Sequence, residues 1–94
     1  MRSKKPQGYF QFFRSLKESK GTELADFQLV KSTREEIARA SNGNVKSRAD
    51  IGLDLMAAAF NNLQLTKIRA ILYILENDFQ VPLYQIVRDL RDRD

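Results

Sequence analysis

The sequence predicts an all-α fold, a compact single domain of five to six helices that includes one candidate helix-turn-helix. Apolar residues recur mainly at the three- and four-residue spacing of amphipathic helices. Capping and turn residues separate these periodic segments at distances that fit short helices. The 94 residues suffice for one modest core, and 43% hydrophobic with 30% charged residues is the balance of an ordinary globular chain.

The N-terminal residues differ in character from the rest of the chain. Residues 1–8 contain Pro6 and Gly8 and have no apolar side chain after Met1, which predicts a flexible basic arm. We expect a single helical domain over residues 9–94. This domain shows no internal repeat, low-complexity stretch or interdomain linker.

An aromatic stripe predicts the first helix, which we expect to end near Lys20-Gly21. The stripe follows the i, i+3, i+4, i+7 spacing of one helical face and consists of Tyr9, Phe12, Phe13 and Leu16. Three aromatic rings on one helical face favour burial in a core over a stacking platform for nucleic-acid bases.

Two helices are expected between Thr22 and Ser41. Thr22 has a side chain suited to the N-cap of a short first helix. Thr33 and Glu36 have the spacing of a capping box, which predicts that a new helix begins there and runs through Ser41. Residues 42–44, Asn-Gly-Asn, predict a turn because both residue types tolerate positive φ.

The second half of the chain predicts three more helices. Ser47 and Asp50 form a second capping box, which starts a helix that reaches about Phe60. Its apolar residues do not stay on one narrow face, so we expect its second half to be the most enclosed element. Thr66 is expected to cap the next helix, and Pro82 to lie in the first turn of the last one. The apolar positions of these two helices are Ile68, Ile71, Leu72, Leu75 and Phe79, then Leu83, Ile86, Val87 and Leu90. The charged tail, residues 88–94, is expected to fray into solvent.

The residue types present exclude several function classes. The sequence contains no Cys and no His, which removes disulfides, the common zinc ligand sets and the usual nucleophile-base pairs. Asp50 and Asp54 share one helix face, but two carboxylates without further ligands predict solvated surface rather than a metal site. We therefore expect no enzyme activity, no metal and no cofactor. The longest apolar stretch, residues 56–60, is much shorter than a membrane span, so we expect a cytoplasmic protein.

The formal net charge is +4, and the positive charge is concentrated near the N-terminus. Residues 1–20 hold six basic side chains against Glu18 alone. A field of this sign attracts polyanions such as nucleic acid.

Residues 34–40, the turn that follows and the helix after Ser47 have the order helix, turn, helix, which can place a second helix in the major groove. Residues 13–21 and 33–40 resemble the opening of repressors of the lambda repressor and Cro type. Residues 71–75 and 79–86 are similar to the closing helices of that family.

This resemblance implies that residues at the front of the second helix of the motif face the bases of DNA. Those residues are Asn44, Lys46, Ser47 and Arg48. Arg48 suits a bidentate pair with guanine and Asn44 one with adenine. Phosphates would be neutralised by Lys46 and by the arm residues Arg2, Lys4 and Lys5.

Two function hypotheses remain after these steps. The first is a small DNA-binding transcriptional regulator, in the form of a homodimer that reads a short two-fold site. The second is a small helical adaptor, inhibitor or immunity-type protein that binds a protein partner and has no nucleic-acid function. Residues 65–94 also loosely resemble the later helices of MerR-type regulators, and we interpret that helix pair as core or as a dimer interface.

Overall fold

A computed structural model of the chain describes residues 8–18 and 27–93. Within these residues the chain is all-helical, as predicted, with five α-helices and no strand. None of the described helices is both long and apolar enough to cross a membrane. The helices are α1 (Tyr9–Glu18), α2 (Phe27–Ser41), α3 (Arg48–Asn61), α4 (Leu65–Asn77) and α5 (Leu83–Asp92).

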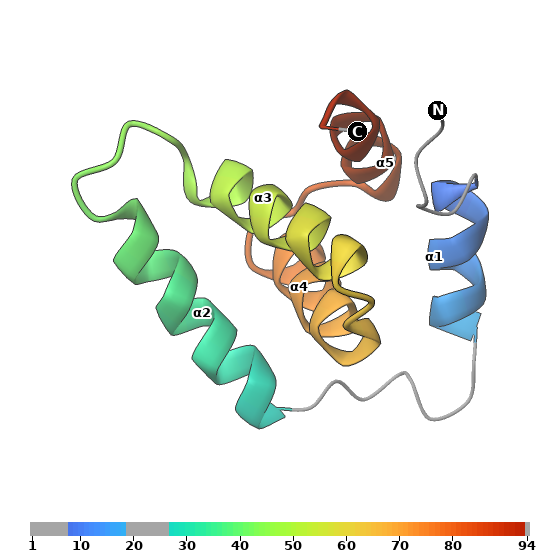
Figure 1. The fold of residues 1–94 in the computed structure, drawn as a ribbon, viewed down its shortest axis with the longest axis horizontal. Coiled ribbons are helices and arrows are strands. Elements are labelled where there is room, and N and C mark those ends of the chain that lie inside the picture. Colours follow the sequence, from blue (N-terminus) through green and yellow to red (C-terminus); the bar gives the residue numbers. More distant parts are fainter. Residues whose placement is uncertain (1–7, 19–26, 94) are drawn as a thin grey trace.

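Helices α3 and α4 form the centre of the molecule, with α2 on one side and α1 and α5 on the other (Figure 1). A smaller apolar cluster joins α2 to the central pair and includes Val30, Ile37, Ile51 and Ile74. A larger cluster joins α1 and α5 to the central pair and includes Phe13, Met56, Leu75 and Ile86. Because α3 contributes to both clusters, its apolar residues cannot lie on one face, which explains the irregular pattern seen in its sequence.

The aromatic stripe of α1 is part of the core. The rings of Tyr9, Phe12 and Phe13 each meet Phe60 of α3 edge to face, with centroid distances of 5.3, 5.4 and 5.8 Å. Such edge-to-face pairs stabilise a fold beyond the burial of their area. The core interpretation of this stripe is therefore confirmed: Tyr9, Phe13 and Leu16 are buried, and the half-buried Phe12 packs against them.

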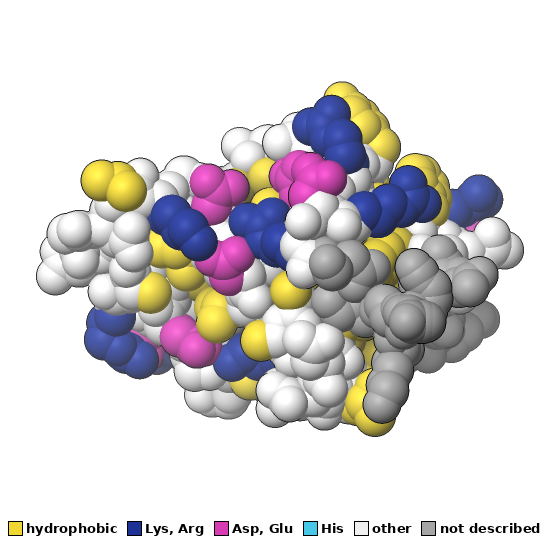
Figure 2. All heavy atoms as spheres, turned by 45° about the horizontal axis from the view of Figure 1, so that its top comes forward, with side chains coloured by type: hydrophobic (Ala, Val, Ile, Leu, Met, Phe, Trp, Pro, Cys, Tyr) yellow, Lys and Arg dark blue, Asp and Glu magenta, His cyan; other side chains and the backbone are white. Residues whose placement is uncertain are grey.

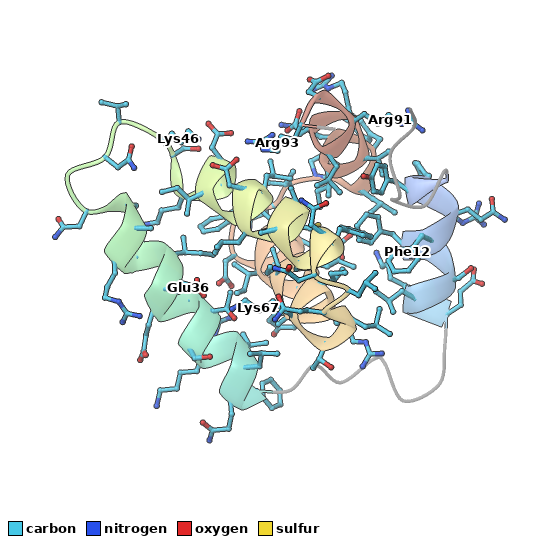
Figure 3. The ribbon with its side chains drawn as sticks, in the orientation of Figure 1. Phe12, Glu36, Lys46, Lys67, Arg91 and Arg93 are labelled. Atoms are coloured by element: carbon cyan, nitrogen blue, oxygen red, sulfur yellow. The ribbon has the colours of Figure 1, made fainter. Side chains whose placement is uncertain are left out.

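The predicted capping box at Thr33 is wrong, because α2 is one continuous helix through this position. Thr33 lies on the buried face of α2, three residues after Val30 and four before Ile37. Burial on this face outweighs the capping preference of the Thr side chain. Glu36 contacts Lys67 of α4 instead, with 2.9 Å between Oε1 and Nζ (Figure 3). The predictions for Lys20-Gly21 and Thr22 lie outside the described residues.

The remaining helix starts agree with the sequence to within one or two residues. Ser47 caps α3 as predicted, since its Oγ accepts a hydrogen bond of 3.1 Å from the backbone N–H of Asp50. Thr66 is not the cap of α4, because the backbone carbonyl of Gln64 already accepts from the N–H of Ile68 at 2.9 Å. Pro82 stands at the N-cap of α5, one residue before the expected first turn.

Candidate nucleic-acid interface

Helices α2 and α3 are joined by an exposed turn, residues 42–47, at one end of the molecule (Figure 1). Gly43 has φ +73°, a conformation that favours glycine. The side-chain carbonyl of Asn44 accepts a hydrogen bond of 3.0 Å from the backbone N–H of Lys46. Val45 is fully exposed at 102%. The turn thus has defined internal hydrogen bonds and presents an open surface.

Three of the predicted base-facing residues have structural roles in this turn. Asn44 also donates from its amide nitrogen to the carbonyl of Ala40 at 3.4 Å, so both ends of its amide are engaged. The hydroxyl of Ser47 caps α3. The ammonium of Lys46 lies 2.7 Å from a carboxylate oxygen of Asp54, so its charge is offset within the chain.

Arg48 is the predicted residue that keeps an accessible charge. It is the first residue of α3, its side chain is exposed, and its Nε donates to the hydroxyl of Ser41 at 3.3 Å. No carboxylate pairs with it among the described residues. The bond to Ser41 fixes the guanidinium beside the last turn of α2 and leaves its two terminal nitrogens for a ligand.

Arg39 is a further basic residue that was not predicted as a site residue. It is exposed in the last turn of α2, and it too has no ion pair within the described part of the chain. A basic residue in the last turn of a helix is commonly explained by its favourable interaction with the helix dipole. The place of Arg39 next to the turn in the sequence is the signal that could have added it to the candidate residues. The arm residues Arg2, Lys4 and Lys5 lie outside the described residues.

A network of charges borders the turn on the side of α5 (Figure 3). Arg93 donates from Nε to Asp54 at 2.7 Å, and its Nη2 lies 3.9 Å from the carboxylate of Asp50. Burial alone would raise the pKa of Asp54, but hydrogen bonds from Lys46 and Arg93 outweigh that effect and lower its pKa below the ordinary value. The aspartate pair is thus neutralised by two cations of this chain. Among the described residues, no group of three or more acidic side chains is placed to hold a metal ion.

Arg93 also corrects the expectation of a fraying tail. Besides Asp54, it donates from Nη1 to the backbone carbonyl of Asp89 at 3.1 Å and so closes the end of α5. Its side chain is only 24% exposed. The hydrogen bond between Arg93 and Asp54 links residues 39 positions apart, so no local sequence pattern predicts it.

Basic and acidic side chains are intermingled over the face that Figure 2 shows, rather than collected into one continuous basic surface. The candidate site residues that the structure describes lie at the end of the molecule formed by the last turn of α2, residues 42–47 and the first turn of α3. We call this surface the α2–α3 end.

No family model, no curated protein and no solved structure matches this chain. The chemistry of the residues and their placement are therefore the basis on which a function is assigned.

Proposed function

We propose that this protein is a small DNA-binding transcriptional regulator that contacts the duplex through the α2–α3 end. The observation that carries the proposal is the exposed guanidinium of Arg48, held at the N-terminus of α3 without a carboxylate partner in the described part of the chain. Arg is the side chain that most often recognises guanine in the major groove, through two parallel hydrogen bonds. A helix N-terminus also favours nearby phosphate.

The structure supports a revised set of roles for the predicted residues. Arg48 reads a base and Arg39 neutralises a phosphate, whereas Ser47 and Asn44 hold the shape of the turn. Lys46 can contact a phosphate only after it leaves Asp54. The arm residues Arg2, Lys4 and Lys5 would add further phosphate contacts.

The burial of α3 limits how much sequence one subunit can read. Ile51, Leu53 and Met56, the fourth, sixth and ninth residues of α3, are buried, so only the N-terminal end of the helix is free to enter a groove. One strong base contact gives little specificity, since a good bidentate pair is worth about 1 to 3 kcal/mol. This constraint favours a homodimer, because two subunits double the contacts on a two-fold site.

The proposal is tested by fluorescence anisotropy with random duplex DNA at two salt concentrations and with a site selected from a random library. Replacing Arg48 with Ala should weaken binding to the selected site by about tenfold to a hundredfold, because one bidentate base contact is lost. Binding to random DNA should fall much less, since at most one phosphate contact changes.

Arg14→Ala is the matched control. Arg14 is also exposed and has no ion pair among the described residues, but it lies on α1, on the other side of the molecule from the α2–α3 turn (Figure 1). Its loss should change affinity for the selected site by no more than about twofold. The regulator proposal fails if no duplex binds in a salt-dependent manner, or if the two variants lose affinity equally.

One observation favours the alternative, a helical protein that binds another protein. Leu63 in the α3–α4 turn is 87% exposed and has φ 54°, a backbone conformation that is strained for Leu. Gly or Asn would remove both the strain and the exposed apolar surface, so a Leu there suits a contact with a partner. Leu63→Asn should keep the fold and lose a partner that wild type captures in stoichiometric amount. Failure of wild type to retain any such protein would count against this alternative.

A further inference from the structure

A pocket of about 460 Å³ opens between the C-terminal half of α2, the end of α4 and the first residue of α3. Its volume lies within the range of small-molecule sites in proteins. Phe79 and Ala38 give it accessible apolar surface, with the buried Ile37 and Ile74 beneath, and Arg48 lines it from α3. The pocket therefore adjoins the α2–α3 end and shares Arg48 with it.

Arg34 and Asp78 form an ion pair at the rim of the pocket. Arg34 donates from Nε and Nη2 to the two carboxylate oxygens of Asp78, at 2.7 and 3.0 Å. The guanidinium also lies over the ring of Tyr73, 5.9 Å from its centroid. Because Asp78 already neutralises Arg34, that guanidinium is not free for a ligand. Arg48 is the other basic residue of the lining, and it has no carboxylate partner among the described residues.

Two groups of the lining have no ion-pair partner within the described part of the chain, Arg48 and Glu35. Arg48 is held by the hydroxyl of Ser41, so its remaining N–H donors are already placed for a planar anion. Glu35 has no ion pair that would position it within the described part of the chain. Arg48 is thus better positioned than Glu35 to pair with a ligand, and a guanidinium pairs with an anion.

We propose that this pocket binds a small organic carboxylate with an apolar body. The carboxylate pairs with Arg48, and the body packs on Phe79 and Ala38. Because Arg48 is also the base-reading residue of the proposed regulator, a bound carboxylate competes with DNA for the same guanidinium. This last step rests on the proposed function, whereas the binding of the carboxylate does not.

The binding step is tested by an NMR titration of the isotope-labelled protein with 4-phenylbutyrate as the probe and its neutral amide as the ligand control. A compound of this size should bind at about millimolar Kd. Its shifts should be centred on residues 34–38, 48 and 74–79, and the amide should bind about tenfold more weakly. Equal affinity for the acid and the amide, or shifts centred elsewhere, would overturn the proposal.

Three variants examine the lining. Arg48→Ala should weaken binding of the acid by roughly tenfold to a hundredfold. Ala38→Trp, at an exposed position of the lining, should block the pocket while Arg48 remains. Glu35→Gln should strengthen binding of the acid, because it removes a like charge; weaker binding would contradict a carboxylate bound beside Glu35. Circular dichroism establishes that each variant is folded, and unchanged binding in both Arg48→Ala and Ala38→Trp would refute the site.

The competition step is tested by repeating the DNA titration with 4-phenylbutyrate at ten times its measured Kd. If the acid and DNA exclude each other at Arg48, this concentration of acid should raise the apparent Kd for DNA about tenfold. If the acid binds but no duplex does, the pocket stands and the DNA-binding proposal falls. If both ligands bind with no effect on each other, the shared use of Arg48 is wrong.

Discussion

Thr33 is completely buried on the core face of α2, and its hydroxyl oxygen has no hydrogen-bond partner among the residues that the structure describes. A buried polar group without a partner destabilises the folded state by its desolvation. Thr33→Val keeps the shape of the side chain and removes that group, so we expect the free energy of unfolding to rise by about 1 kcal/mol. Urea denaturation measures this, and Thr66→Val at an exposed position should have little effect. A loss of stability in Thr33→Val would indicate that the hydroxyl is satisfied in solution.

The site residues could be predicted from the sequence only in part. The residues at the start of α3 were identifiable because Ser47 and the Asn-Gly-Asn turn are local signals. The sequence does not show which of these residues keeps an accessible charge, because that depends on where Asp54 and Arg93 lie in the fold. Lys46 and Arg48 have similar charge and nearby positions in the sequence, yet a carboxylate pairs with only the former in the described structure.

The start of α3 depends on one side chain. The hydrogen bond from the Asp50 N–H to the hydroxyl of Ser47 satisfies one of the N–H groups that the first turn leaves unpaired. Ser47→Ala should lower the free energy of unfolding by about 1 kcal/mol, measured by urea denaturation. Ser32→Ala is the matched control, since that hydroxyl only bonds back to the carbonyl of Leu29 within α2. An effect of Ser47→Ala no larger than that of the control would contradict the capping role.

Among the elements, those with a clear helical period were predicted best. The inner faces of α1, α4 and α5 follow from the spacing of their apolar residues, because one dominant face packs against the core. The start of α2 was not predicted, because Thr33 and Glu36 carry a capping signal although tertiary contacts place both within the helix. Local signals thus fail where packing partners come from distant parts of the chain.

At the scale of the molecule, the contacts of Asp54 join α5, α3 and the α2–α3 turn. Because these contacts lower the pKa of Asp54 in the folded state, they stabilise the fold at pH above its unfolded value near 3.8. That contribution is lost as the pH falls through the lower, folded pKa. Wild type should therefore lose stability below about pH 4 by more than Asp54→Asn does.

The measurement is the free energy of unfolding by urea at a series of pH values from 6 down to about 2. Asp92→Asn is the control, because Asp92 is exposed on α5 and has no ion pair among the described residues. Its pH profile should run parallel to that of wild type. Parallel profiles of wild type and Asp54→Asn would show that the network contributes nothing to the acid response.

The aromatic face of α1 has a consequence for synthesis of the chain on the ribosome. Phe13 finds its edge-to-face partner in Phe60, and α1 lies beside α5, so its partners emerge well after it. At typical translation rates the 47 residues from Phe13 to Phe60 take about 2 to 9 s to be added. Until Phe60 has been added, the three rings lack the partner that they meet in the folded chain, so the packing of α1 is completed late in synthesis.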